Sequence, residues 1–173
     1  MKNIILLFCS IIIFLLSTVF EVKAQAAVTA TATAEIIEAL TTTETSQMNF
    51  GRFSPETQGG KVIMTPDGVR SSQGTIALVG GTHTSASFYI TGQYDATISI
   101  TLPTGPELLT NLENDKTMVV SEWQSIPADG DGAGKLIGGE LTVKVGASLT
   151  VGDMNANPKG VYAGTYAVTF AYN

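Results

Sequence analysis

The chain has 173 residues, of which 14% are charged, and its formal net charge is −6. An acidic, lysine-poor chain is a poor match for nucleic acid, which is therefore excluded as a partner. With one cysteine and one histidine in the whole sequence, the chain offers too few ligands for a transition-metal site.

Residues 1–24 predict a secretory signal peptide. Lys2 provides a basic start, an apolar run covers 4–20, and a small-residue cleavage signal ends at Ala24. A retained membrane anchor is the alternative, because the run is slightly long for a signal and slightly short for a membrane span. Cleavage leaves 25–173 as a single domain with no cysteine and no expected membrane partner. We expect it to be secreted, in the periplasm or at the bacterial cell surface.

Short alternating stretches, separated by glycine, proline and aspartate turn signals, predict about nine strands and no helical crossover. Strands at this spacing indicate an all-β antiparallel sandwich, with a small closed barrel as the alternative. The predicted strands are 28–40, 46–53, 61–64, 75–79, 86–91, 97–102, 117–123, 139–145 and 162–172.

Both ends of the predicted domain alternate strictly. Because side chains alternate across a strand, each end has an apolar row on one face. The first row is Val28, Ala30, Ala32, Ala34 and Ile36. The last row is bulkier and contains Tyr162, Tyr166, Val168, Phe170 and Tyr172.

Two arrangements of the first strand remain open. It either pairs beside the last strand within one molecule, or it is donated to a groove beside the last strand of another subunit. In the second arrangement an isolated subunit has an exposed apolar groove until a partner fills it.

No catalytic constellation is visible in the sequence. His83 lies in a polar glycine–threonine segment, where we expect an exposed loop residue, and no nucleophile elbow is present. Scattered carboxylates are the one remaining route to catalysis. We expect no enzyme activity, no catalytic or cofactor-binding residue and no cofactor.

An acidic glycine-rich segment partly follows an EF-hand loop, with Asp129, Asp131 and Glu140 at its first, third and twelfth positions. Ala133 at the fifth position cannot ligate a metal, and no helices flank the segment. We expect a tight turn, with a weak calcium site as the alternative.

Trp123, Tyr89 and Tyr94 are the aromatic residues that a sugar-binding face would use. Trp123 lies on an alternating strand and is expected to pack in the core. The alternative function is a self-contained monomeric binding or adhesion module, for example for surface glycan, that uses loops 103–116 and 127–135.

Five segments in order are the Ala-Thr repeat after Val28, Met48-Asn-Phe-Gly-Arg-Phe53, Thr65-Pro-Asp-Gly68, Leu141-Thr-Val with Gly146-Ala-Ser-Leu-Thr-Val151, and the stretch from Gly164 to Asn173. Together they resemble a family of bacterial secreted domains of unknown function, across nearly all of 26–173. The resemblance implies an immunoglobulin-like antiparallel β-sandwich of about eight to nine strands. More distantly, the chain is similar to chaperone–usher pilin subunits and to spore-coat-U-like proteins.

Such pilin subunits have a penultimate tyrosine and a glycine fourteen positions from the end, which Tyr172 and Gly160 match. The resemblance implies a donor strand at 28–36 and a chaperone-held terminal strand with Tyr166, Val168, Phe170 and Tyr172. We therefore expect a structural subunit of a cell-surface assembly, pilin-like or coat-like, that assembles by strand complementation. Its expected partners are copies of itself or related subunits, and a periplasmic chaperone.

Overall fold

The computed structural model describes residues 25–173, and the predicted signal peptide lies outside the described residues. The chain divides into two units, 1–35 and 36–173. In the described part of the first unit, residues form neither helix nor strand and their side chains are exposed. Within this single chain the predicted strand at 28–40 does not form, and the first strand begins at Thr41. A row made mostly of alanine buries too little apolar area to hold a strand without a partner.

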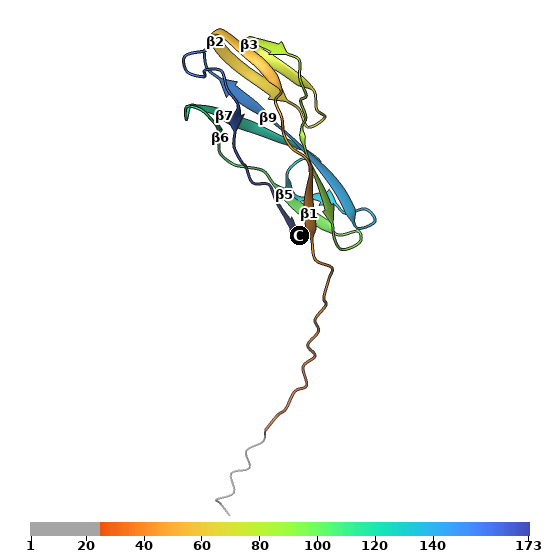
Figure 1. The fold of residues 1–173 in the computed structure, drawn as a ribbon. Coiled ribbons are helices and arrows are strands. Elements are labelled where there is room, and N and C mark those ends of the chain that lie inside the picture. The colour runs from red at the N-terminus through yellow and green to blue at the C-terminus, as the bar shows by residue number, and fades with distance from the viewer. Residues whose placement is uncertain (1–24) are drawn as a thin grey trace, which may run out of the picture. The chain divides into compact units, whose positions relative to one another are not determined.

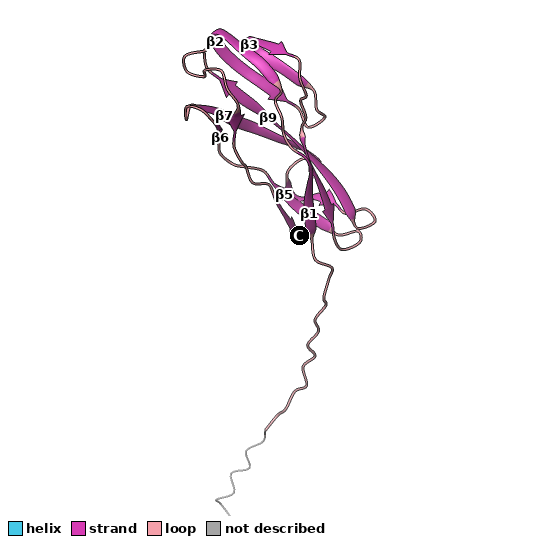
Figure 2. Cartoon of the chain, in the orientation of Figure 1, coloured by secondary structure: helices cyan, strands magenta, loops and turns pink. Residues whose placement is uncertain are grey.

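The second unit is all-β, with no helix and eleven strands among the described residues (Figure 2). Nothing helical within 25–173 has the length and hydrophobicity of a membrane-spanning segment. The antiparallel β-sandwich is confirmed, with more strands than expected. The strands are β1 (Thr41–Ser46), β2 (Arg52–Met64), β3 (Arg70–Val79), β4 (Ala86–Thr91), β5 (Thr97–Thr101), β6 (Glu107–Asn111), β7 (Thr117–Ile126), β8 (Gly130–Lys135), β9 (Glu140–Val151), β10 (Tyr162–Ala163) and β11 (Thr169–Tyr172).

Two of these strands, β6 and β8, lie in segments predicted as loops or turns. In β8 glycine is required by packing, since a methyl group added at Gly134 would lie 2.8 Å from side-chain atoms of both Ile98 and Leu141. Pairing with β5 makes this segment a strand although its composition predicts a turn.

The large sheet is organised around β9. One edge of β9 pairs with β4 along its first half and with β2 along its second half, while the other edge pairs with β7. The path through this sheet is β1-β4-β9-β7-β6-β10, with β2 and β3 attached beside β9 (Figure 1). The small sheet has only three strands, in the order β11-β5-β8.

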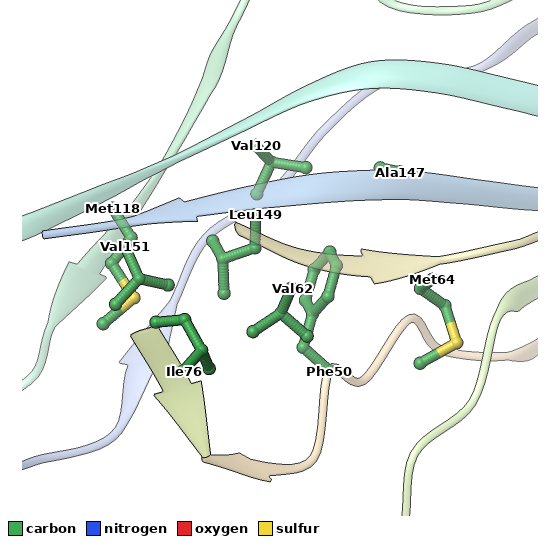
Figure 3. Close-up of a cluster of buried hydrophobic side chains, with 9 residues drawn as sticks. All are labelled: Phe50, Val62, Met64, Ile76, Met118, Val120, Ala147, Leu149 and Val151. Atoms are coloured by element: carbon green, nitrogen blue, oxygen red, sulfur yellow. The ribbon is translucent and has the colours of Figure 1, made fainter. Parts of the chain in front are cut away.

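The apolar core forms two clusters. One lies between the two sheets, where Ile98 and Ile100 of β5 pack with Val143 and Val145 of β9. The other lies on the far half of the large sheet and consists of Phe50, Val62, Met64, Ile76, Met118, Val120, Ala147, Leu149 and Val151 (Figure 3). All members of the second group except Phe50 come from strands of the large sheet. Among the described residues, no strand of the small sheet contributes a side chain to this second cluster.

The C-terminal segment forms two short strands instead of the single strand predicted at 162–172. β10 pairs with β6 in the large sheet, whereas β11 pairs with β5 in the small sheet. Residues 164–168 cross from one sheet to the other and form no strand. Alternation continues through the crossover, which is why periodicity alone predicted one strand.

Candidate functional site

A groove of about 730 Å³ opens beside the second apolar cluster of the large sheet. Segment 47–55, which contains the link from β1 to β2 and the first residues of β2, forms one wall, and segment 157–164 forms the other. Met118, Val120 and Leu149 lie on its floor, and these side chains belong to the cluster in Figure 3. The groove is therefore an elongated apolar trough between two stretches of chain.

A single strand is predicted from 46 to 53, whereas in the structure β1 ends at Ser46, 47–51 is irregular and β2 begins at Arg52. Asn49 makes one isolated bridge to Thr84, and its side-chain oxygen accepts a 2.8 Å hydrogen bond from the amide of Gly51. Gly51 has a φ of +74°, a conformation that favours glycine. The Asn-x-Gly spacing was the available signal for this turn.

The terminal segment beside the groove is incompletely covered. Tyr166, Val168, Phe170 and Tyr172 pack against the inter-sheet cluster but stay only half-buried. The predicted inward row is thus confirmed in direction, and the Phe170 ring lies 5.7 Å from the ring of Phe88. Among the described strands β11 pairs only with β5, and β1 pairs only with β4. Each strand leaves one free backbone edge, which is a template for another strand.

Trp123 and Tyr166 stack at the groove, with ring centroids 4.7 Å apart. The indole nitrogen of Trp123 and the hydroxyl of Tyr166 are both buried without a hydrogen-bond partner in the described structure. Burial, and to a smaller extent the nearby carboxylate of Glu44, raises the pKa of Tyr166 to about 12. Each buried unpaired donor costs about 1–3 kcal/mol. The groove thus contains two donors without acceptors.

Gly160 lies in the second wall at a close approach to a buried side chain. A methyl group added there would overlap the side-chain amide of Asn111. The nitrogen of that side chain donates to the carbonyl oxygen of Lys159 at 3.5 Å. Gly160 therefore positions the wall, and the structure places it beside the groove together with Tyr166.

Hydrogen bonds join the end of β11 to the residues just before β1. The hydroxyl of Tyr172 in β11 donates to the backbone carbonyl oxygen of Glu38 at 2.9 Å and accepts from the backbone amide of Gln93 at 2.7 Å. The amide of Glu38 in turn donates to the side-chain oxygen of Gln93 at 3.3 Å. The groove between segments 47–55 and 157–164 lies away from this bridge, since Tyr166 lines it and no residue of β1 or β11 does.

Residues 25–39, which we call the tail, include the predicted donor positions Val28, Ala30, Ala32, Ala34 and Ile36. The tail has no helix or strand, and all of its side chains are exposed. Val28 is 92% exposed and Ile36 is 98% exposed.

The other predicted candidates stay apart from the groove. Asp129 precedes β8, Asp131 lies within it, and Glu140 begins β9. No group of three histidine, cysteine or carboxylate side chains within 25–173 could hold a metal ion. His83 is an exposed loop residue, as expected, with Nδ1 3.4 Å from the carbonyl oxygen of Gly81.

Comparison with known proteins identifies one relationship. A family model described as Domain of unknown function (DUF4402) matches residues 40–172, a span that begins directly after the tail. No curated protein and no solved structure matches the chain. The expected membership of a family of domains of unknown function is confirmed, while the likeness to pilin and spore-coat-U-like proteins stays a prediction. Because the match covers most of the sequence, the chain belongs to the family described as Domain of unknown function (DUF4402).

Proposed function

We propose that this chain is a secreted structural subunit of a cell-surface assembly, and that each copy inserts its tail into the groove of the next copy. One observation carries the proposal: an apolar groove lies beside a half-covered terminal strand, in a chain whose alternating tail is fully exposed. Adding a strand to an exposed sheet edge is a recurrent mode of peptide recognition.

Donation to another copy is favoured over pairing within one molecule by the residues that join the tail to β1. A tail that folded back beside its own β11 would have to reverse direction between Ile36 and Leu40. No glycine, proline, asparagine or aspartate occurs from 25 to 48, and these are the residues that tight turns require. The backbone of Glu38 is also bound on both sides, by Gln93 and Tyr172.

The tail fits the groove in length and in side-chain size. Nine residues of extended chain span about 30 Å, which is comparable to the terminal segment 162–172. Burying Val28 and Ile36 contributes about 1.5–3 kcal/mol each, and each alanine methyl adds about 0.8 kcal/mol. Backbone hydrogen bonds along the free edge add about 0.5–1.5 kcal/mol each. Association therefore depends on backbone pairing plus two large anchoring side chains.

An unfilled groove would expose apolar surface and an open strand edge before assembly. The proposal therefore includes a periplasmic chaperone that covers the groove until another subunit arrives. The same groove would accept the tail of a related subunit, provided that its tail also presents an alternating apolar row.

The test is electrophoresis of residues 25–173 in SDS with and without boiling. Interlocked subunits should give a ladder that survives SDS and collapses to a monomer band on boiling. The variant Ala32→Arg places a charge on the inserted face and should remove the ladder, because a buried unpaired charge is strongly unfavourable.

Thr31→Arg is the matched control, since it introduces the same charge at the neighbouring residue on the opposite face. This variant should keep the ladder. Identical behaviour of the two variants would contradict insertion of a strand, and a wild-type chain that runs only as a monomer would contradict assembly altogether.

A second candidate function, a binding module for surface glycan, is favoured by one observation. A smaller cavity of about 410 Å³ lies between 102–106, 121–123 and Asp129, so residues of both loops predicted for this function contribute to it together with β7. Its lining combines an aromatic ring with the carboxylates of Glu122 and Asp129. A glycan array probed with monomeric 25–173 tests this function, and binding that Asp129→Ala abolishes would support it.

A further inference from the structure

Both arginines and the only histidine of the chain lie together beside one wall of the groove. Arg52 lines the groove and extends over Gly81, where an added methyl group would lie 3.3 Å from its Cγ atom. A methyl group added at Gly51 would contact the Arg70 guanidinium and would lie 3.3 Å from Cβ of His83. We call Arg52, Arg70 and His83 the cationic corner.

The charges of the cationic corner are not neutralised within the described chain. The single ion pair found in 25–173 joins Lys61 to Glu122. Arg70 instead donates to backbone carbonyl oxygens, at 3.0 Å to Phe50 and 3.2 Å to Arg52. In a protein with an acidic net charge, such a concentration of unpaired cations attracts a carboxylate-bearing partner.

The tail carries the complementary charges at one end only. Glu35 and Glu38 are its two charged residues, and they flank Ile36 at the end nearest β1. The other end, around Val28, contains alanine, threonine and glutamine. The tail therefore has a direction that a cationic surface can distinguish.

We propose that the tail of one copy lies in the groove of the next with Glu35 at the cationic corner and Val28 pointing toward Tyr172. This inference rests on the proposed function and specifies its direction. Arg52 lies in the lining of the groove, whereas β11 and Tyr172 lie outside that lining, so a tail with Glu35 at the cationic corner extends its Val28 end past Tyr166 along β11. The inserted strand then runs antiparallel to β11, the more stable orientation per residue.

This direction has a consequence for the assembly. Glu38 of the donating copy stays next to its own Tyr172 and Gln93, so the β11 end of one copy faces the cationic corner of the next. All copies then point the same way along the assembly. Without this contact two acidic subunits would repel one another, and the cationic corner therefore speeds their encounter.

The experiment measures the rate at which SDS-resistant bands form from residues 25–173 at low ionic strength. Arg52→Glu should slow assembly by about tenfold, because electrostatic steering changes association rates by at least that factor. The Arg52 side chain makes no hydrogen bond in the structure, so this variant should keep the wild-type unfolding curve. Lys116→Glu makes the same charge change on an exposed turn and should assemble at the wild-type rate.

A variant that exchanges the two charges tests whether Glu35 pairs with Arg52. The double variant Arg52→Glu with Glu35→Arg should recover the wild-type rate, because the two charges exchange places. Failure to recover would overturn the inference, since the cationic corner would then bind some other anion.

The remaining outcomes separate this inference from the proposed function. If wild type and Arg52→Glu assemble at equal rates, or if Lys116→Glu is slowed as much as Arg52→Glu, the direction is wrong while strand insertion stands. If the wild-type chain forms no SDS-resistant species at all, the proposed function fails and this inference fails with it.

Discussion

The hydroxyl of Tyr172 donates a 2.9 Å hydrogen bond to the carbonyl oxygen of Glu38, and this contact ties the last strand to the residues just before the first strand (Figure 1). The same hydroxyl accepts a hydrogen bond from the backbone amide of Gln93 at 2.7 Å. One side chain thus holds the end of β11 against Glu38 and Gln93.

Removing this hydroxyl should destabilise the domain. Tyr172→Phe keeps the ring but leaves the Gln93 amide and the Glu38 carbonyl without their partner. We expect the free energy of unfolding in urea to fall by about 1–3 kcal/mol. Tyr94→Phe changes a side chain that is 67% exposed and should leave the free energy of unfolding unchanged. Equal stability of the two variants would contradict a structural role for the Tyr172 hydroxyl.

Removing the hydroxyl of Tyr166 should have the opposite effect. This hydroxyl is buried without a partner, so Tyr166→Phe eliminates an uncompensated desolvation cost. We expect the free energy of unfolding at neutral pH to rise by about 1 kcal/mol. A loss of stability in urea would show that the hydroxyl has a partner in solution.

The raised pKa of Tyr166 also predicts a pH dependence. The unfolded tyrosine ionises near its ordinary pKa of 10.0, whereas in the folded protein the pKa is about 12. Folded-state stability is therefore fully present below pH 10 and falls as the pH rises toward 12. Urea unfolding at pH 9 and pH 11 should show a smaller drop for Tyr166→Phe than for wild type. An identical drop would contradict the assignment of this ionisation to Tyr166.

The sequence predicts those features of the structure that depend on a local pattern, and not those that depend on contacts between distant segments. Ile98 and Ile100 alternate and are almost fully buried, so the strand that contains them was predicted within one residue of its bounds. The alternation of the tail is just as regular, but periodicity shows only that a segment suits a strand, and not which sheet receives it. The groove could not be predicted, because segments 47–55 and 157–164 meet only through the sheet between them.

Glycine at 146 is required by a close backbone approach between strands. A methyl group added there would overlap the carbonyl oxygen of Met64 and lie 2.6 Å from the backbone nitrogen of Pro66. Gly146→Ala should lower the free energy of unfolding by about 1–3 kcal/mol, the usual cost of overpacking. Gly105→Ala, where an added methyl group meets open space, should change it by less than about 0.5 kcal/mol. Equal urea midpoints would contradict this account of β9.

Asn157 should hold the second wall of the groove in place. It is buried, its side-chain nitrogen donates to the carbonyl oxygen of Thr117 at 2.7 Å, and its side-chain oxygen accepts from the amide of Gly152 at 2.6 Å. Asn157→Ala removes both hydrogen bonds and should cost about 1–3 kcal/mol in thermal or urea unfolding. Asn155→Ala is the control, since that exposed side chain makes no hydrogen bond in the structure. A larger loss in the control would contradict this role.

The central claim is that the tail is paired in another copy and unpaired in an isolated one. Hydrogen–deuterium exchange on separated monomer and oligomer fractions of 25–173 tests it most directly. We predict that the amides of 28–36, and those amides of 164–172 that do not already pair with β5, exchange fast in the monomer and become protected together in the oligomer. Protection of 28–36 in the monomer, or an oligomer in which 28–36 still exchanges freely, would contradict the account.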